Sequence, residues 1–262
     1  DQSISLYNKV NILSDNNISY IKYSSTHNAL IIVYKNSNID LLINEDIYNI
    51  PDFMNKTMSQ DKTLNSINIS GDFAYFSTNF GILILNLKKK EITNTFILNK
   101  KVYASVIKDN TIYAATENGL FSGKITDNLL DNNNWSLFNE TVFNQLSLFE
   151  NNIIGNKLNN GIYQYDENFK TFTQLIGGYY AFADVFDDKL IAGNNNSIVI
   201  FNHYNSFKSM DLKDGFNHLS YSKNDNSYWG SNGNKGLNGY KLNDNKLEKS
   251  VSSIIPDSPK RN

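Results

Sequence analysis

The chain has 262 residues, with 24 lysine and arginine residues against 26 aspartate and glutamate residues, and no cysteine. The near-neutral balance gives no electrostatic footprint for nucleic acid, and the lack of cysteine excludes a disulfide scaffold, a thiolate metal site and a cysteine nucleophile. A hydrophobic fraction of 40% is too high for a disordered chain. The apolar runs are strand-sized, so we expect no membrane-spanning segment in this chain.

In chain order, the first predicted element is an outer β-strand in residues 1–12, which resemble the polar fourth strand of later units. After it, one phrase recurs six times: an apolar strand, a polar turn, a second apolar strand, a glycine-type turn and a third strand. In the first unit these strands are residues 18–21, residues 29–34 and a run from residue 38. The glycine-type turns of the six units fall at Asn38, Gly81, Gly119, Gly161, Ser197 and Gly236.

Each unit is expected to continue into a fourth, more polar strand, as at residues 91–98, 170–175, 207–212 and 246–251. Four short antiparallel strands in about forty residues are the blade of a β-propeller. A β-sandwich would not repeat one phrase at near-constant spacing, and a leucine-rich solenoid has a shorter period. We therefore predict an all-β fold, a β-propeller of four-stranded antiparallel blades. Six blades are visible beside the outer-strand remnant, and we expect seven in the parent protein.

Turn chemistry agrees with this fold. Glycine and asparagine suit the recurrent turn because tight hairpins need positive φ. Asparagine is unusually frequent, at 44 positions, and we interpret this first as compositional bias and expect much of it in blade turns.

We expect the propeller to span residues 1–255. Residues 256–262, with two prolines, are predicted to be an exit linker to a downstream domain.

The motifs of catalysis are missing from the sequence. We find no nucleophile elbow, zinc-binding histidine helix or phosphate loop, so we expect no catalytic residue, no metal and no cofactor. We expect His27 and His203 to be solvated loop residues. Asp187 and Asp188 fall at a predicted turn, where aspartate is a default residue. A propeller hydrolase or lyase would need carboxylates or histidines that converge at one mouth, and the sequence places no such set.

Alignment of the inner strands puts small or amide side chains at one level. The six aligned residues are Ser19, Asn65, Ala104, Asn144, Ala183 and Asn217. Inner strands line the narrow, wet channel of a propeller, so Asn65, Asn144, Asn217 and the adjacent His218 are candidate contacts for a polar ligand. The alternative, which we favour, is that these side chains hold channel water and satisfy strand ends.

Aromatic residues in connecting loops are the other candidates for ligand binding. Trp135 follows an asparagine-rich loop, and Tyr179 and Tyr180 follow two glycines. Exposed loop rings stack on sugars or anchor protein partners. The same rings can instead fold back onto the blade, and the sequence leaves both possibilities open.

The repeat also resembles a known family. Residues 13–23, Leu-Ser-Asp-Asn-Asn-Ile-Ser-Tyr-Ile-Lys-Tyr, resemble the two-component-regulator propeller repeat of Bacteroidetes, and Tyr228-Trp-Gly with Gly236-Leu is closer still. That repeat usually has glycine where Ile12 stands, and a tryptophan that Leu30-Ile lacks. Residues 7–15, 31–42, 229–240 and 256–262 resemble more narrowly the PorZ family of type IX secretion accessory proteins.

The narrower resemblance implies a particular setting. In that family a first propeller precedes a second one and a C-terminal secretion-signal-like domain. The family also implies an exported protein at the cell surface, in an attachment complex with a sortase-like partner, to which anionic lipopolysaccharide is supplied. We therefore expect a non-catalytic propeller that binds a glycan, lipopolysaccharide or a secretion-complex protein. The alternative is a periplasmic sensor domain of a hybrid two-component system that recognises a polysaccharide fragment.

Overall fold

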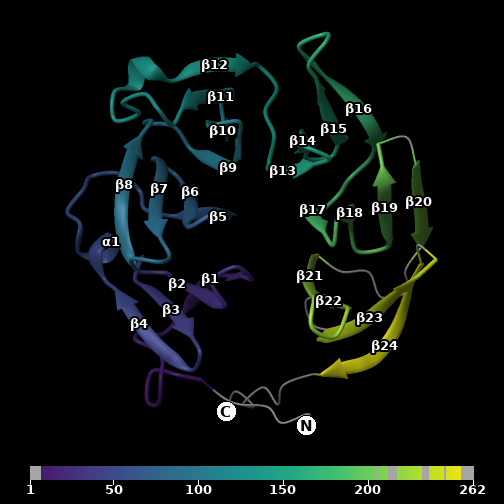
Figure 1. Cartoon of the computed structure of the whole chain (residues 1–262), viewed down its shortest axis with the longest axis horizontal. Coiled ribbons are helices and arrows are strands. Elements are labelled where there is room, and N and C mark those ends of the chain that lie inside the picture. The colour runs from purple at the N-terminus through teal and green to yellow at the C-terminus, as the bar shows by residue number, and fades with distance from the viewer. Residues whose placement is uncertain (1–6, 205, 212–216, 232–235, 245, 255–262) are drawn as a thin grey trace. The chain divides into compact units, whose positions relative to one another are not determined.

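The computed structural model describes residues 7–204, 206–211, 217–231, 236–244 and 246–254, the last with side chains only to residue 250. Within these residues the chain forms 24 strands in six four-stranded sheets. In every sheet, strands that follow one another in the chain pair side by side and antiparallel, as Figure 1 shows. The predicted fold class is confirmed: an all-β propeller fold of six four-stranded antiparallel blades.

The chain divides into two compact units, residues 1–142 and residues 143–262, each with three blades. The strands of the first unit are β1 (Ile18–Ser24), β2 (Ala29–Tyr34), β3 (Ile39–Ile43) and β4 (Asp46–Ile50) in blade 1, β5 (Leu64–Ser70), β6 (Phe73–Thr78), β7 (Gly81–Asn86) and β8 (Glu91–Ile97) in blade 2, and β9 (Val102–Lys108), β10 (Thr111–Thr116), β11 (Gly119–Lys124) and β12 (Ser136–Asn139) in blade 3.

The strands of the second unit are β13 (Gln145–Phe149), β14 (Asn152–Lys157), β15 (Gly161–Asp166) and β16 (Thr171–Gly177) in blade 4, β17 (Phe182–Phe186), β18 (Lys189–Gly193), β19 (Ser197–His203) and β20 (Ser206–Asp211) in blade 5, and β21 (His218–Ser222), β22 (Ser227–Ser231), β23 (Leu237–Asn243) and β24 (Lys246–Ile254) in blade 6. Every blade has the fourth strand that the repeat predicts, including β4 and β12 in blades 1 and 3, for which no bounds were set from the sequence.

Helical structure is slight. The connection between blades 1 and 2 contains α1 (Asp52–Asn55), whose Phe53 is buried, and the connection from β11 to β12 contains the 3-10 helix η1 (Asn132–Asn134). Lys62 donates its ammonium protons to the Phe53 and Met54 carbonyls, at 2.7 and 3.0 Å, and so satisfies carbonyl groups of α1. In the part of the chain that the structure describes, no helix has the length and apolar character needed to cross a membrane.

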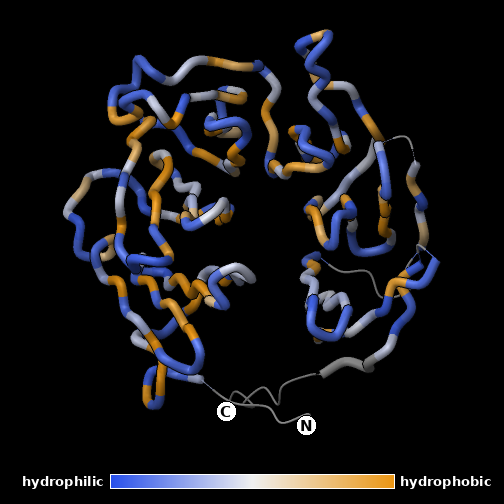
Figure 2. The backbone as a smooth tube through the Cα atoms, viewed as in Figure 1, coloured by the Kyte–Doolittle hydropathy of each residue, from blue (hydrophilic) through white to orange (hydrophobic). Residues whose placement is uncertain are grey.

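The core lies between neighbouring blades. Strand alternation gives each sheet two faces, and most residues of the middle strands are buried or half-buried; in β7 all six residues are buried. In Figure 2, hydrophobic residues lie mostly along strands and the connections are mostly hydrophilic. Separate apolar clusters join blades 1 and 2, blades 2 and 3, blades 4 and 5, and blades 5 and 6.

The recurrent glycine makes room for the outer strand. Gly81 begins β7 with a φ of +150°, and a Cβ there would lie 2.0 Å from the carbonyl oxygen of Phe96 in β8. Gly161 begins β15 with a φ of +130°, and its Cβ would lie 2.0 Å from the carbonyl oxygen of Ile176 in β16. The sequence predicted glycine here for turn conformation, but the stronger requirement is the close approach of the fourth strand.

Tight turns between first and second strands use asparagine and acidic residues. Asp187 and Asp188, which join β17 to β18, have φ values of +48° and +58°. Asp109 and Asn110, which join β9 to β10, repeat this geometry at +48° and +57°. Two successive residues at positive φ are typical of type I′ hairpins, where Asn and Asp are tolerated. The expectation that Asp187 and Asp188 occupy a turn is confirmed.

Residues 7–17 cover one face of blade 1. The side of blade 1 that faces blade 2 is apolar, and the opposite side carries Ile32 and Tyr34, which are 3% and 1% exposed. Leu13 packs against both, with Ile12 beside it. The predicted outer strand is wrong for its described part, residues 7–12, which contain a turn at residues 9–12 and no strand. Residues 1–6 and the predicted linker 256–262 lie outside the described residues.

Candidate functional site

The predicted inner-strand amides bond mainly to backbone. The Asn65 amide donates 2.8 Å to the Val102 carbonyl of blade 3 and 3.0 Å to the Asn79 side chain. Asn144 accepts from the Leu158 N–H at 2.9 Å. Such bonds satisfy strand ends and connections, which is the alternative that the sequence favoured.

At the start of blade 6 the backbone N–H of Asn217 donates to the Ser231 carbonyl at 3.0 Å. His218, the first residue of β21, is exposed. Ligand contact by these two residues stays a prediction.

Two of the three predicted loop aromatics are buried. Trp135 is 8% exposed: its indole N–H donates 3.1 Å to the Leu129 carbonyl, and its ring meets Phe96 edge-on at 6.0 Å. Tyr180 is 6% exposed, and burial raises the pKa of its hydroxyl. Both rings therefore fold back onto their blades. Tyr179 is 46% exposed and keeps a ring surface in solvent.

Of the two histidines expected to be solvated loop residues, His203 is exposed and His27 is not. His27 is not a solvated loop residue, as the sequence predicted, because its side chain is only 14% exposed and its ring nitrogens lie 3.2 Å from Ser24 Oγ and 3.0 Å from Asp72 Oδ1. Asp72 lies in the first hairpin of blade 2, so this contact links two blades. His203 is 75% exposed and contacts Glu150. Among the described residues, no three potential metal ligands gather at one place.

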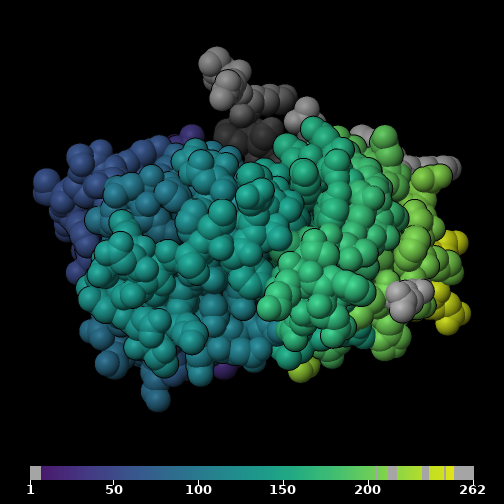
Figure 3. All heavy atoms as spheres, turned by 90° about the horizontal axis from the view of Figure 1, so that it is seen from above, coloured from purple at the N-terminus to yellow at the C-terminus, as the bar shows by residue number. Residues whose placement is uncertain are grey.

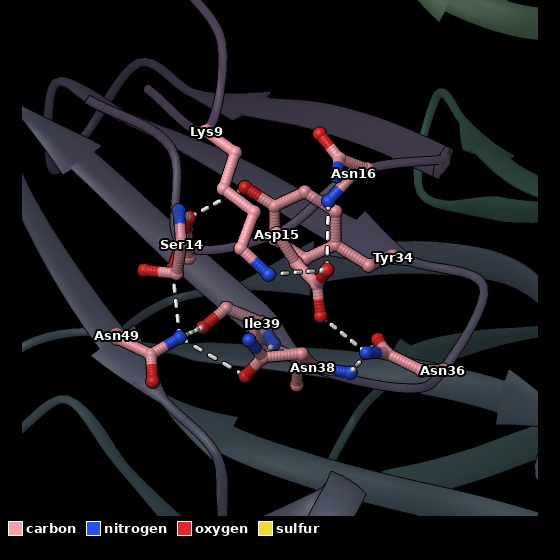
Figure 4. A network of polar contacts seen from close by, with 10 residues as sticks. Lys9, Ser14, Asp15, Asn16, Tyr34, Asn36, Asn38, Ile39 and Asn49 are labelled. Atoms are coloured by element: carbon pink, nitrogen blue, oxygen red, sulfur yellow. Dashed lines mark hydrogen bonds and ion pairs between the residues drawn. The ribbon is translucent and has the colours of Figure 1, made fainter. Parts of the chain in front are cut away.

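Blade 1 holds a buried polar network that the sequence did not predict (Figure 4). Asp40 is fully buried and accepts from the Tyr34 hydroxyl at 2.5 Å, the Asn49 amide at 2.8 Å and the Ser14 N–H at 2.9 Å. Burial and the Asp40 carboxylate raise the pKa of Tyr34, so the hydroxyl remains a donor. With three donors on its two oxygens, Asp40 is satisfied within the blade, and the network fastens residues 7–17 in place.

Side-chain amides of blade 4 also form hydrogen bonds with the backbone at the start of blade 5. Gln145 donates 3.1 Å to the Ala181 carbonyl and accepts from the Ala183 N–H at 2.9 Å. Asn156 donates 3.0 Å to Gln145 and 3.0 Å to the Tyr180 carbonyl. The sequence pointed to Asn144 but not to Gln145, the next residue. Gln145 could have been found because it begins the inner strand β13, beside the level at which small and amide residues recur.

A polar groove lies between the outer strands of blade 4 and the β19–β20 hairpin of blade 5. We call it the blade 4–5 groove; its volume is about 410 Å³ and its lining residues are Gln164, Asp166, Thr173, Gln174, Leu175, Tyr204 and Phe207. Phe207 is 49% exposed and its ring centroid lies 5.1 Å from that of buried Phe201. The groove thus offers amide, hydroxyl and carboxylate groups beside an exposed ring, a combination suited to sugar hydroxyls and sugar C–H faces.

Tyr204 is fixed at the end of this groove. Its hydroxyl donates 2.5 Å to the Phe149 carbonyl, with the Glu150 carbonyl at 3.1 Å. Its ring meets Phe149 edge-on, with centroids 5.3 Å apart. Burial and the nearby Glu150 charge raise the pKa of Tyr204 to about 12. The ring is therefore a neutral, oriented wall of the groove.

The first unit contains a different cavity, which we call the blade 2–3 pocket. It lies between blade 2 and the β11–β12 connection, and its volume is about 200 Å³. Its lining is mostly apolar: Phe73, Tyr75, Ile84, Thr93, Asn94, Phe96, Ile112, Ile125, Asp127, Asn128, Leu129 and Leu130. Neither this pocket nor the blade 4–5 groove includes a residue that the sequence proposed for a site.

The sequence matches one protein family. A family described as "TSS9, PorZ, N-terminal beta-propeller domain" matches residues 1–136. No curated protein matches the sequence.

Several solved structures share the fold. PorZ, described as an essential bacterial surface component of the type IX secretion system of Porphyromonas gingivalis, superposes with a TM-score of 0.85 at 24% identity, over 97% of this chain and 35% of that chain. The extracellular domains of two hybrid two-component systems from B. thetaiotaomicron give TM-scores of 0.63 and 0.66 at 14% and 12% identity, over 90% and 98% of this chain. The chain spans 33–38% of the length of these structures.

Proposed function

Because this chain belongs to the PorZ N-terminal β-propeller family, we propose that it is a non-catalytic binding domain of an exported, cell-surface accessory protein of type IX secretion. We propose further that it holds a glycan, such as part of a lipopolysaccharide. The relative described as a surface component of that system supports the location. A protein of the secretion complex, including a sortase-like one, is a further partner on this proposal.

The blade 4–5 groove is the observation that carries the glycan proposal. Its volume of about 410 Å³ falls in the range of small-molecule sites, about 300–1,000 Å³. Gln164 and Thr173 are cross-strand partners on β15 and β16, so their polar groups lie side by side. Exposed Phe207 supplies the ring on which a sugar face can stack. Asp166 makes the groove unsuited to an anionic group, so we assign it to a neutral sugar unit of the glycan.

Titration with lipopolysaccharide-derived oligosaccharides, followed by calorimetry, tests this proposal. Phe207→Ala should weaken binding about tenfold, because a stacked ring contributes on the order of 1 kcal/mol or more. Phe169→Ala is the matched control: Phe169 is 78% exposed, on the β15–β16 connection of the same unit and outside the groove lining. Equal binding by wild type and Phe207→Ala would contradict the proposal.

A sensor role is the second candidate function. The superposition on extracellular domains of two-component systems favours it. In that case the same groove would bind a polysaccharide fragment in the periplasm. The gene that encodes the chain distinguishes the two: a second propeller and a small β-domain after this one supports the secretion role, and a membrane helix with a histidine kinase supports the sensor role.

A further inference from the structure

The blade 2–3 pocket arises from one unusually long connection. Third and fourth strands are joined by residues 44–45 in blade 1 and 87–90 in blade 2, but by residues 125–135 in blade 3. Figure 3 shows the teal part of the chain, which includes this connection, at the surface of the first unit. Long loops held on a rigid scaffold are frequent carriers of function.

This connection is held in one shape by its own hydrogen bonds. Trp135 donates to the Leu129 carbonyl at 3.1 Å, and Asn134 donates to the Asn128 carbonyl at 2.9 Å. The Asp131 carboxylate accepts from the Asn133 N–H at 2.9 Å at the start of η1. A site built this way exists before a ligand arrives, so binding costs little loop ordering.

The walls and rim of the pocket favour a cation with an apolar stem. Phe73, Tyr75 and Phe96 line one side, and aromatic ring faces attract cations. Asp127 is the single charged residue of the lining, and within the described part of the chain it makes no ion pair. Its carboxylate accepts only one side-chain hydrogen bond there, from Thr126 at 3.3 Å. Charge and apolar surface thus point to a lysine- or arginine-like group.

Size limits the ligand further. At about 200 Å³, the pocket is below the range of about 300–1,000 Å³ for small-molecule sites, and it suits a single side chain. Leu130 and Ile125, 64% and 42% exposed, stand at its mouth and offer apolar surface to the residues on either side. We propose that the blade 2–3 pocket binds one lysine or arginine side chain of a partner polypeptide, with its methylene stem between the rings and its cation on Asp127.

Three capped pentapeptides test this proposal on the whole chain, each with glycine around a central lysine, arginine or norleucine. Norleucine keeps an apolar stem and removes the charge. We expect the lysine and arginine peptides to bind about tenfold more tightly than the norleucine peptide, because each gains an exposed ion pair and a ring contact. Binding is followed by NMR chemical shifts of blades 2 and 3, and the difference should shrink in 1 M salt.

Asp127→Asn should remove the ion-pair part of this preference and so weaken lysine-peptide binding several-fold, toward the norleucine level. Glu140→Gln is the matched control, an exposed carboxylate on the same blade outside the pocket. Asp127 is exposed, so the variant should keep the wild-type circular dichroism and melting temperature. Equal binding of the lysine and norleucine peptides, or full lysine-peptide binding by Asp127→Asn, would overturn the proposal. Phe207→Ala should leave peptide binding unchanged, so this site and the proposed glycan groove can fail separately.

Discussion

The blade 2–3 pocket and the blade 4–5 groove occupy the same position in two pairs of blades but differ in chemistry. In each, the outer strands of one blade form a wall, and the third-to-fourth-strand connection of the next blade forms the other. Residues 125–135 fold Trp135 and Leu129 inward and leave an apolar pocket. In blade 5, Tyr204 after β19 and Phe207 of β20 instead line a polar groove. One connection can therefore change the chemistry of the cavity lining while the blades stay alike.

Truncation of Trp135 should break this comparison most severely. Trp135→Ala removes a buried ring that packs on Phe96 and Gly123, so we expect a loss of about 3–5 kcal/mol in unfolding free energy, confined to the first unit. Chemical denaturation measures the loss, and hydrogen exchange assigns it to blades. Tyr179→Ala, at an exposed ring, should stay within about 0.5 kcal/mol of wild type. If Trp135→Ala also lost only about 0.5 kcal/mol of unfolding free energy, the wall of the blade 2–3 pocket would not depend on this ring.

Two glycine substitutions test whether the outer strand β8, which lines the blade 2–3 pocket, lies as close to β7 as the structure shows. Gly81→Ala places a Cβ against the Phe96 carbonyl, and we expect a loss of about 3 kcal/mol from the clash and the positive φ together. Gly71→Ala is the matched control, because its φ is +57° but no atom lies within 4 Å of the added Cβ; it should lose about 1 kcal/mol. Equal losses by denaturation would mean that backbone conformation alone selects glycine here.

Substitution of Tyr204, which lines the blade 4–5 groove, should have the smallest effect on stability, and that effect should depend on pH. Its folded pKa, about 12, lies above the ordinary value of 10.0. Its contribution to stability is therefore complete below pH 10 and is lost as the pH rises through 12. Tyr204→Phe should be about 1 kcal/mol less stable than wild type at neutral pH, because the variant loses the hydroxyl contacts with the Phe149 and Glu150 carbonyls. That difference in unfolding free energy should narrow between pH 10 and 12 in denaturation curves.

Much of the fold follows from the repeat, because strand alternation and turn residues are local signals. The first three strands of the blades lie where the phrase predicts, and the Asp187–Asp188 turn has the positive φ values that its residue types tolerate. No bounds were set from the sequence for the fourth strands β4 and β12, in which Ile50 is the one buried residue and the apolar signal is weak. β12 also follows a long connection that interrupts the spacing.

The candidate sites were far less predictable. Burial of Trp135 depends on the space left by Gly123 on a neighbouring strand, and no pattern within the loop encodes that contact. His27 meets Asp72 across a separation of 45 residues, so its loop position suggested a solvent exposure that packing removes. The lining of the blade 4–5 groove comes from two blades, and a repeat that aligns blades with one another does not show which side chains meet between them.

The segment 7–17 makes the packing of blade 1 depend on residues outside its sheet. An apolar side chain that covers a face of a sheet removes that face from water, as a further strand would. Leu13 and Ile12 close that face over Ile32 and Tyr34, and Asp40 tethers the closure at the Ser14 N–H. One face of blade 1 is thus completed by a stretch that contributes no strand to its sheet and is attached through the carboxylates of Asp40 and Asp15.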